Sequence, residues 1–128
     1  MKTIFDALYA KLQGSPLSVA IGGRYYPIQG PVGTAVPYCV ASIISELPRY
    51  ALAHIFNDVL IEISVFATDA TTMHTVSELV FSLFDRSTLS GLVGYEQVGP
   101  MDRDSGQPLI MDGVYRYIIE YRLNLKKL

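Results

Sequence analysis

The sequence contains few of the side chains from which catalytic and metal centres are built. Its 128 residues include one cysteine, two histidines and no tryptophan, and only 17% of them are charged. The single thiol, Cys39, excludes an intrachain disulfide and a site with several thiolate ligands. His54 and His74 are too few for a histidine cluster, and neither has a nearby acidic residue in a pattern that would orient its ring as a general base. We therefore predict no catalytic residue, no cofactor and no metal ion, and thus a protein that is not an enzyme.

A basic charge excess and long apolar segments are also missing. The formal net charge of −2 gives no electrostatic footprint for a nucleic acid. No apolar run approaches the roughly 20 residues needed to cross a bilayer. Asp6 and Lys11 break the pattern expected of a signal peptide. We therefore expect a cytoplasmic protein with a reduced Cys39 and no membrane partner.

Apolar and aromatic side chains are abundant by comparison. Hydrophobic residues make up 50% of the chain, which includes nine tyrosines and five phenylalanines. A chain of this length and composition fits a single domain over residues 1–128. Tyrosine is favoured on surfaces that are wet before assembly and buried after it, which indicates an oligomer. A monomer with an unusually apolar core is the alternative interpretation.

Hydrophobic periodicity predicts the order helix, strand, strand, helix, strand, strand. The helices are expected over residues 3–13 and from Asp69, as N-cap, to about residue 85, and the strands over residues 38–47, 57–67, 91–98 and 114–125. Residues 24–27 are expected to be briefly extended, residues 28–37 and 102–108 to be loops, and residues 126–127 to be a frayed end.

This order predicts the fold class α+β, with an antiparallel sheet of about four main strands, two helices packed on one face, and long loops. In the strand over residues 57–67, alternate apolar residues share one face. Leu60, Glu62, Ser64 and Phe66 share the other, which is mixed rather than polar. A face of this kind suits coverage by a neighbouring chain.

Four segments together resemble a known family. They are Gly22-Gly23-Arg24-Tyr25-Tyr26-Pro27, the strand entry Pro37-Tyr38-Cys39-Val40, the strand Asp58–Ala67 that leads into an acid-capped helix ending Leu83-Phe84-Asp85, and Asp112-Gly113-Val114-Tyr115-Arg116-Tyr117. In this order they resemble the tail completion, or tail terminator, family of long-tailed bacteriophages and related prophages. The lambda-type tail terminator and tail-to-head joining proteins share this plan. The resemblance covers roughly residues 4–124.

The resemblance implies a tail-terminator-like subunit that forms a closed ring, usually a hexamer. Such a ring caps the tail tube, ends its polymerisation and meets the head connector, without catalysis. The implied partners are other copies of the chain, the tail tube protein and the head–tail connector proteins, with DNA only passing through the channel. The implied location is the virion, after assembly in the host bacterial cytoplasm. The alternatives are a neck or head-completion protein of the same plan, a small α+β ligand-binding domain and a small enzyme.

No motif identifies the residues that join neighbouring subunits of such a ring. The candidates are one segment, two residues of the mixed strand face and one polar loop: Arg24, Tyr25 and Tyr26; Glu62 and Phe66; and Asp102, Arg103 and Asp104 within residues 102–107. Each has a plainer alternative. The first segment could pack locally against the sheet, Glu62 could be a solvated strand residue, and residues 102–107 could be an ordinary polar loop.

Overall fold

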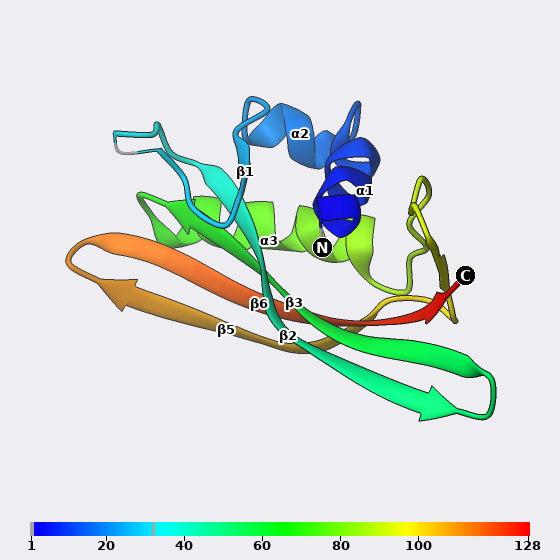
Figure 1. Ribbon diagram of the computed structural model, residues 1–128. Helices are drawn as coiled ribbons and strands as arrows, with labels where there is room; N and C mark the ends of the chain where they lie inside the picture. The colour runs from blue at the N-terminus through cyan, green and yellow to red at the C-terminus, as the bar shows by residue number, and fades with distance from the viewer. Residues whose placement is uncertain (1, 32) are drawn as a thin grey trace.

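Two long β-hairpins form most of the sheet in the computed structural model, which describes residues 2–31 and 33–128. The first consists of β2 (Tyr38–Ala51) and β3 (His54–Ala67), and the second of β5 (Asp102–Met111) and β6 (Val114–Lys127). Their inner strands, β3 and β6, pair antiparallel from Phe56↔Lys126 to Ala67↔Tyr115. This pairing places the turns of the two hairpins at opposite ends of the molecule (Figure 1).

Two short strands complete a mixed sheet of six strands. β1 (Tyr25–Pro27) runs parallel to the beginning of β2, and β4 (Tyr95–Gln97) pairs with the end of β6. The order is β1-β2-β3-β6, and β5 and β4 share the remaining edge of β6. The expected antiparallel sheet of about four strands with two helices was therefore wrong, because β1 is parallel, β5 forms from residues expected to be a loop, and there are three helices among the described residues.

The misassigned elements share a physical cause. Every residue of β5 is exposed, so this strand is held by backbone pairing to β6 and leaves no apolar alternation in the sequence. The same holds for the outer part of β2, which continues past Pro48 to Ala51 with all its residues exposed. The strand expected over residues 91–98 is reduced to Tyr95–Gln97, and Lys126 and Lys127 belong to β6 rather than to a frayed end.

The three helices lie on the same side of the sheet (Figure 1). They are α1 (Lys2–Leu12), α2 (Pro16–Ala20) and α3 (Ala70–Phe84). α3 packs on β3 and β6, and α2 packs on α3. The predicted N-cap of α3 is confirmed, since the Asp69 carboxylate accepts hydrogen bonds from the Thr72 N–H at 2.7 Å and the Thr72 hydroxyl at 2.9 Å. These bonds lower the pKa of Asp69.

The core lies between the helices and one face of the sheet. Alternate residues of the two central strands supply most of its sheet side, and all of them are buried: Val59, Ile61, Ile63, Val65, Ile119, Tyr121, Leu123 and Leu125. Period-2 alternation is what a strand with one covered face requires, which is why the pattern predicted these two strands. In the described part of the chain, no helix lies on the opposite face of the sheet (Figure 1).

A buried tyrosine ties the end of α3 to the sheet. The Tyr121 hydroxyl donates a hydrogen bond to Asp85 Oδ1 at 2.6 Å. Arg103 of β5 lies 3.4 Å from Asp85 Oδ2, and its guanidinium stacks 3.8 Å from the centre of the Phe81 ring. Burial and the bond to Asp85 both raise the pKa of Tyr121. The C-terminal turn of α3 is thus held to β6 and β5 by one carboxylate.

The substitution Tyr121→Phe tests this link. It removes the hydroxyl and leaves the ring in the core, so we expect the free energy of unfolding to fall by about 1.5 kcal/mol, the lower end for a hydrogen bond to a charged group. Urea denaturation measures the change. Tyr50→Phe is the matched control, because Tyr50 is exposed and its substitution should change stability by less than about 0.5 kcal/mol. Equal effects of the two substitutions would contradict this role of Tyr121.

Candidate functional site

We call the sheet surface that points away from the helices the open face. It is formed by alternate residues of the three central strands, among them Val40 and Ser42 of β2, Leu60, Glu62, Ser64 and Phe66 of β3, and Arg116, Ile118, Glu120 and Arg122 of β6. This surface includes the mixed strand face that the sequence singled out. The helices of the described residues lie on the other side of the sheet, and we therefore take this face as the candidate site (Figure 1).

A polar cluster around Arg116, which we call the Arg116 cluster, occupies the middle of the open face. Arg116 donates hydrogen bonds from Nε and Nη2 to Ser64 Oγ, at 3.2 and 3.0 Å, and Nη2 lies 3.4 Å from Glu62 Oε2. The Ser42 hydroxyl donates to the same Glu62 oxygen at 3.3 Å. Ser64 is 1% exposed, and the side chains of Glu62 and Arg116 are largely covered. The two opposite charges satisfy each other, an arrangement that organises a surface rather than activating a nucleophile.

Aromatic rings flank this cluster. The Tyr38 and Phe66 rings stack in parallel with centroids 4.7 Å apart, and Tyr26 meets Tyr38 edge-on at 6.1 Å. The Arg116 guanidinium lies 5.2 Å from the centre of the Phe66 ring. Gly30 approaches these rings so closely that a Cβ there would lie 2.9 Å from Tyr38 Cε2. The loop after β1 is therefore packed against this corner of the open face.

Two hollows lie on either side of Phe66 and Arg116. The one toward the β5–β6 turn, which we call the apolar pocket, has a volume of about 290 Å³ and is lined by Phe66, Leu109, Met111, Asp112, Val114 and Arg116. The other has a volume of about 240 Å³ and lies between the loop at residues 28–30 and the polar centre of the open face. A shallow apolar hollow beside a polar cluster suits the side chain of a binding partner.

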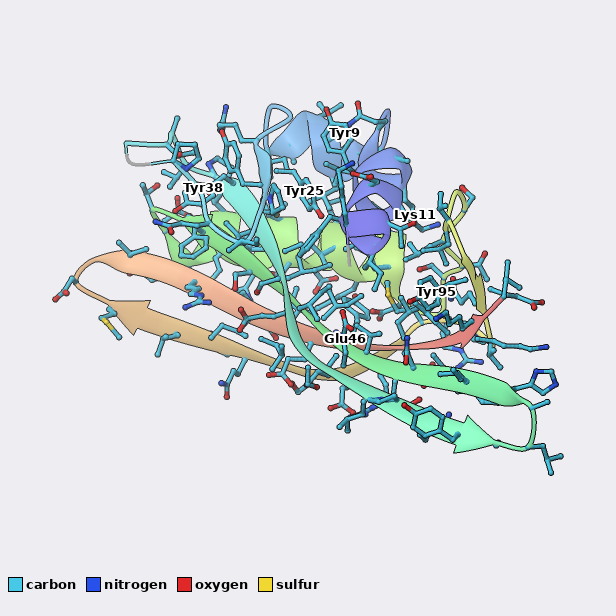
Figure 2. All side chains as sticks on the ribbon, in the orientation of Figure 1. Tyr9, Lys11, Tyr25, Tyr38, Glu46 and Tyr95 are labelled. Atoms are coloured by element: carbon cyan, nitrogen blue, oxygen red, sulfur yellow. The ribbon has the colours of Figure 1, made fainter. Side chains whose placement is uncertain are left out.

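The structure separates the residues expected at the ring interface into four groups, three of which come from residues 24–26 and the open face. Glu62 and Phe66 lie together on the open face. Arg24 donates from Nε to the Pro37 carbonyl at 3.2 Å, and Tyr26 packs on Tyr38, so both hold the loop before β2. Tyr25 is buried on the helix side, with its ring centroid 6.0 Å from that of Tyr9 (Figure 2).

The three acidic and basic residues of β5 are held by neighbours within the subunit. Asp102 pairs with Arg86, Arg103 pairs with Asp85, and Asp104 lies 3.4 Å from Arg122. They lie on a strand at the sheet edge rather than in the polar loop that was expected. Their exposed charges line the outer edge of the second hairpin.

Sequence reasoning missed the ends of the two hairpins. Both ends carry large exposed apolar side chains: Leu47, Tyr50 and Leu52 on the first, and Leu109, Ile110, Met111 and Val114 on the second. The sequence signal was an apolar run at residues 50–53 between two strands and another at residues 109–111. Neither run was interpreted as an exposed surface for a partner, because both segments were assigned to connections between strands.

The structure offers no metal centre within residues 2–31 and 33–128, where no three acidic, histidine or cysteine side chains gather. No helix in this same part of the chain has the length and apolar character needed to span a membrane. His74 packs edge-on against Tyr117, and His54 lies at the first hairpin turn beside Phe56. Neither histidine is placed beside a reactive group.

Comparisons with known proteins support the fold. No protein-family model matches the sequence, and no curated protein sequence matches it. Among solved structures, a chain from the virion of a native gene transfer agent particle is similar, with a TM-score of 0.76 and 16% sequence identity. The similarity covers 94% of this chain and 92% of that chain. The two chains therefore share a fold over almost their entire lengths.

The contribution of the Arg116 cluster to stability can be tested by the substitution Arg116→Met. The substitution keeps an apolar stem but leaves Glu62 and Ser64 without their partner in a largely covered place, so we expect a loss of about 1–2 kcal/mol in unfolding free energy. Arg122→Met is the control, since its ion pair with Asp104 is half-exposed and should be worth less than about 0.5 kcal/mol. A double-mutant cycle with Glu62→Gln measures the coupling directly. If the effects of Arg116→Met and Glu62→Gln on the unfolding free energy are additive, the two side chains do not stabilise each other.

Cys39 provides a prediction of pH dependence. Burial raises the pKa of its thiol to about 12 from 9.0. Because the folded-state pKa lies above the unfolded one, the contribution to stability is complete below about pH 8.5 and is lost as the pH rises toward the folded-state pKa. The urea midpoint should therefore fall between pH 8.5 and 10 in the wild type and fall less in Cys39→Ala. If the urea midpoint falls equally with pH in the wild type and in Cys39→Ala, the Cys39 thiol is not the source of this pH dependence.

Proposed function

We propose that this protein is a structural component of a phage-like virion. The observation that carries the proposal is the full-length similarity to a chain of a gene transfer agent virion, at a TM-score of 0.76. The sequence resemblance to tail terminators points independently in the same direction. A small subunit with exposed apolar hairpin ends suits a part that works by assembly with other chains.

Within a virion, we propose the role of tail terminator. Several copies form a closed ring on the end of the tail tube, end its polymerisation and offer the surface that meets the head–tail connector proteins. A ring requires an interface in which two different surfaces of the subunit meet, and whose rotation closes. The two hairpins supply such surfaces, since their exposed apolar ends differ in sequence and point in opposite directions.

The proposed partners follow from this role. They are other copies of the chain, the tail tube protein and the connector, with DNA only passing through the channel and the protein located in the virion after assembly in the bacterial cytoplasm. Of the candidate interface residues, we propose Glu62, Phe66, Asp102 and Asp104 as direct contacts of a neighbouring copy, because the first two line a hollow of the open face and the last two are exposed on β5. Arg24, Tyr26 and Arg103 would act through the loop and strand that they hold.

The assembly state is the direct test. Light scattering coupled to size exclusion, over a wide range of concentrations, should give a discrete mass of about six subunits, and electron microscopy should show rings. Added to polymerising tail tube protein, the ring should cap the tubes and shorten them. A ring that binds the connector but leaves tube length unchanged would favour a neck protein of the same plan.

A different result would contradict the proposal itself. A protein that stays monomeric at every concentration, and neither binds tube ends nor changes tube length, has no terminator role. The ligand-binding alternative would then gain weight, with the two hollows of the open face as its sites.

A further inference from the structure

The turn of the first hairpin, at residues 50–53, has a composition that its fold does not explain. We call this segment the hairpin tip. Leu52 adopts a left-handed φ of 54°, which glycine or asparagine adopts at lower cost, and its side chain is fully exposed. Tyr50 beside it is 76% exposed. Neither turn geometry nor burial in the subunit calls for a leucine at this position.

The hairpin tip is held in place by the paired strands β2 and β3. The ladder between β2 and β3 continues to the last pair, Ala51↔His54. Arg49 adds a bidentate ion pair with Asp58, at 2.7 and 3.0 Å, and its guanidinium lies 5.7 Å from the centre of the Phe56 ring. A projecting apolar segment held in this way loses little conformational freedom when it binds, which favours tight association.

The apolar pocket is at the opposite end of the molecule. Its walls come from the second hairpin, with Leu109, Met111 and Val114 around the Phe66 ring. These wall residues are exposed in the isolated subunit. The antiparallel pairing of β3 and β6 puts the pocket near Ala67↔Tyr115 and the hairpin tip beyond Phe56↔Lys126. The turns of the two hairpins lie at opposite ends of the ribbon (Figure 1). The tip therefore cannot reach the pocket of its own subunit.

The polar groups at the two ends also suit each other. The Arg49 charge is already paired with Asp58, and Arg116 at the pocket wall is already paired on the open face, so neither needs a partner from another copy. His54 lies next to the hairpin tip and carries a ring N–H donor, and the Asp112 carboxylate at the wall of the apolar pocket accepts hydrogen bonds. An apolar tip beside a hydrogen-bond donor thus matches an apolar hollow beside an acceptor.

We infer that the hairpin tip of one copy inserts Leu52 and Tyr50 into the apolar pocket of the next copy. The contact is head-to-tail, because each subunit contributes its tip on one side and its pocket on the other. This inference rests on the proposed function and identifies the surfaces that would join neighbours in the ring. It also accounts for Phe66 as part of the interface, because its ring lines the pocket.

Complementation between two variants tests the contact. Leu52→Asp damages the tip and Met111→Glu damages the pocket, both at exposed positions where the fold should tolerate the change, and the two introduced carboxylates repel each other where they meet. Each should raise the concentration needed for ring assembly at least tenfold, with unchanged circular dichroism. Val93→Asp is the matched control, because Val93 is an exposed apolar residue outside the hairpin tip and the apolar pocket, and this variant should assemble like the wild type.

Mixing the two variants in equal amounts should give a discrete species of two subunits, each subunit having a mass of 14.2 kDa. This is expected because the intact tip of one variant meets the intact pocket of the other, whereas the damaged pair cannot close the ring. Separate variants that lose assembly, with a mixture that stays monomeric, would show that tip and pocket do not meet each other. A Leu52→Asp protein that forms rings like the wild type would also overturn the inference. This holds even if those rings no longer cap tubes, because the inference concerns the contact between neighbouring copies.

Cross-linking provides a second measurement on the intact assembly. Leu52→Cys combined with Met111→Cys should give a ladder of disulfide-linked oligomers under mild oxidation, whereas Leu52→Cys with Val93→Cys should not. The native Cys39 is buried and does not interfere. Wild-type rings without a ladder would overturn the inference and leave the proposed function in place. A wild type that forms no ring and does not cap tubes would overturn the proposed function.

Discussion

The pairing of β3 with β6 is the interaction on which the rest of the structure depends. It runs from Phe56↔Lys126 to Ala67↔Tyr115 and joins two hairpins that are far apart in the sequence. On one face it assembles the apolar residues that the helices cover, and on the other it brings Arg116 to Glu62 and Ser64. Because it is antiparallel, it also directs the two hairpin turns away from each other.

A subunit with two different ends is suited to one kind of assembly. The helices and the core use one face of the sheet, which leaves the open face and both hairpin ends for partners. The charges of Glu62 and Arg116 in the middle of the open face are paired within the subunit, so covering them does not leave a buried charge without a partner. Apolar side chains at the hairpin ends then supply the gain from burial. On these features we base the proposal of a closed ring of identical copies.

The sequence was most informative where burial imposes a period. The strands around residues 57–67 and 114–125 and the helix capped by Asp69 were predicted because one side of each packs against the core. β5 and the outer part of β2 were not, because exposed strands are held by backbone bonds that any side chains permit. Alternation placed Glu62 and Phe66 on the open face, but only the register between strands, which tertiary pairing determines, identifies Arg116 as their neighbour. Tyr25 could not be assigned to the core from a three-residue strand too short to show a period.

The central claim is that identical subunits meet head to tail through their hairpins. Electron cryo-microscopy of the assembled protein, alone or on the end of a tail tube, tests it most directly. The account predicts a closed ring in which density for Leu52 and Tyr50 of each copy lies against Phe66, Leu109 and Val114 of the next. A two-fold symmetric dimer, or a ring in which the hairpin tips point into solvent, would contradict it.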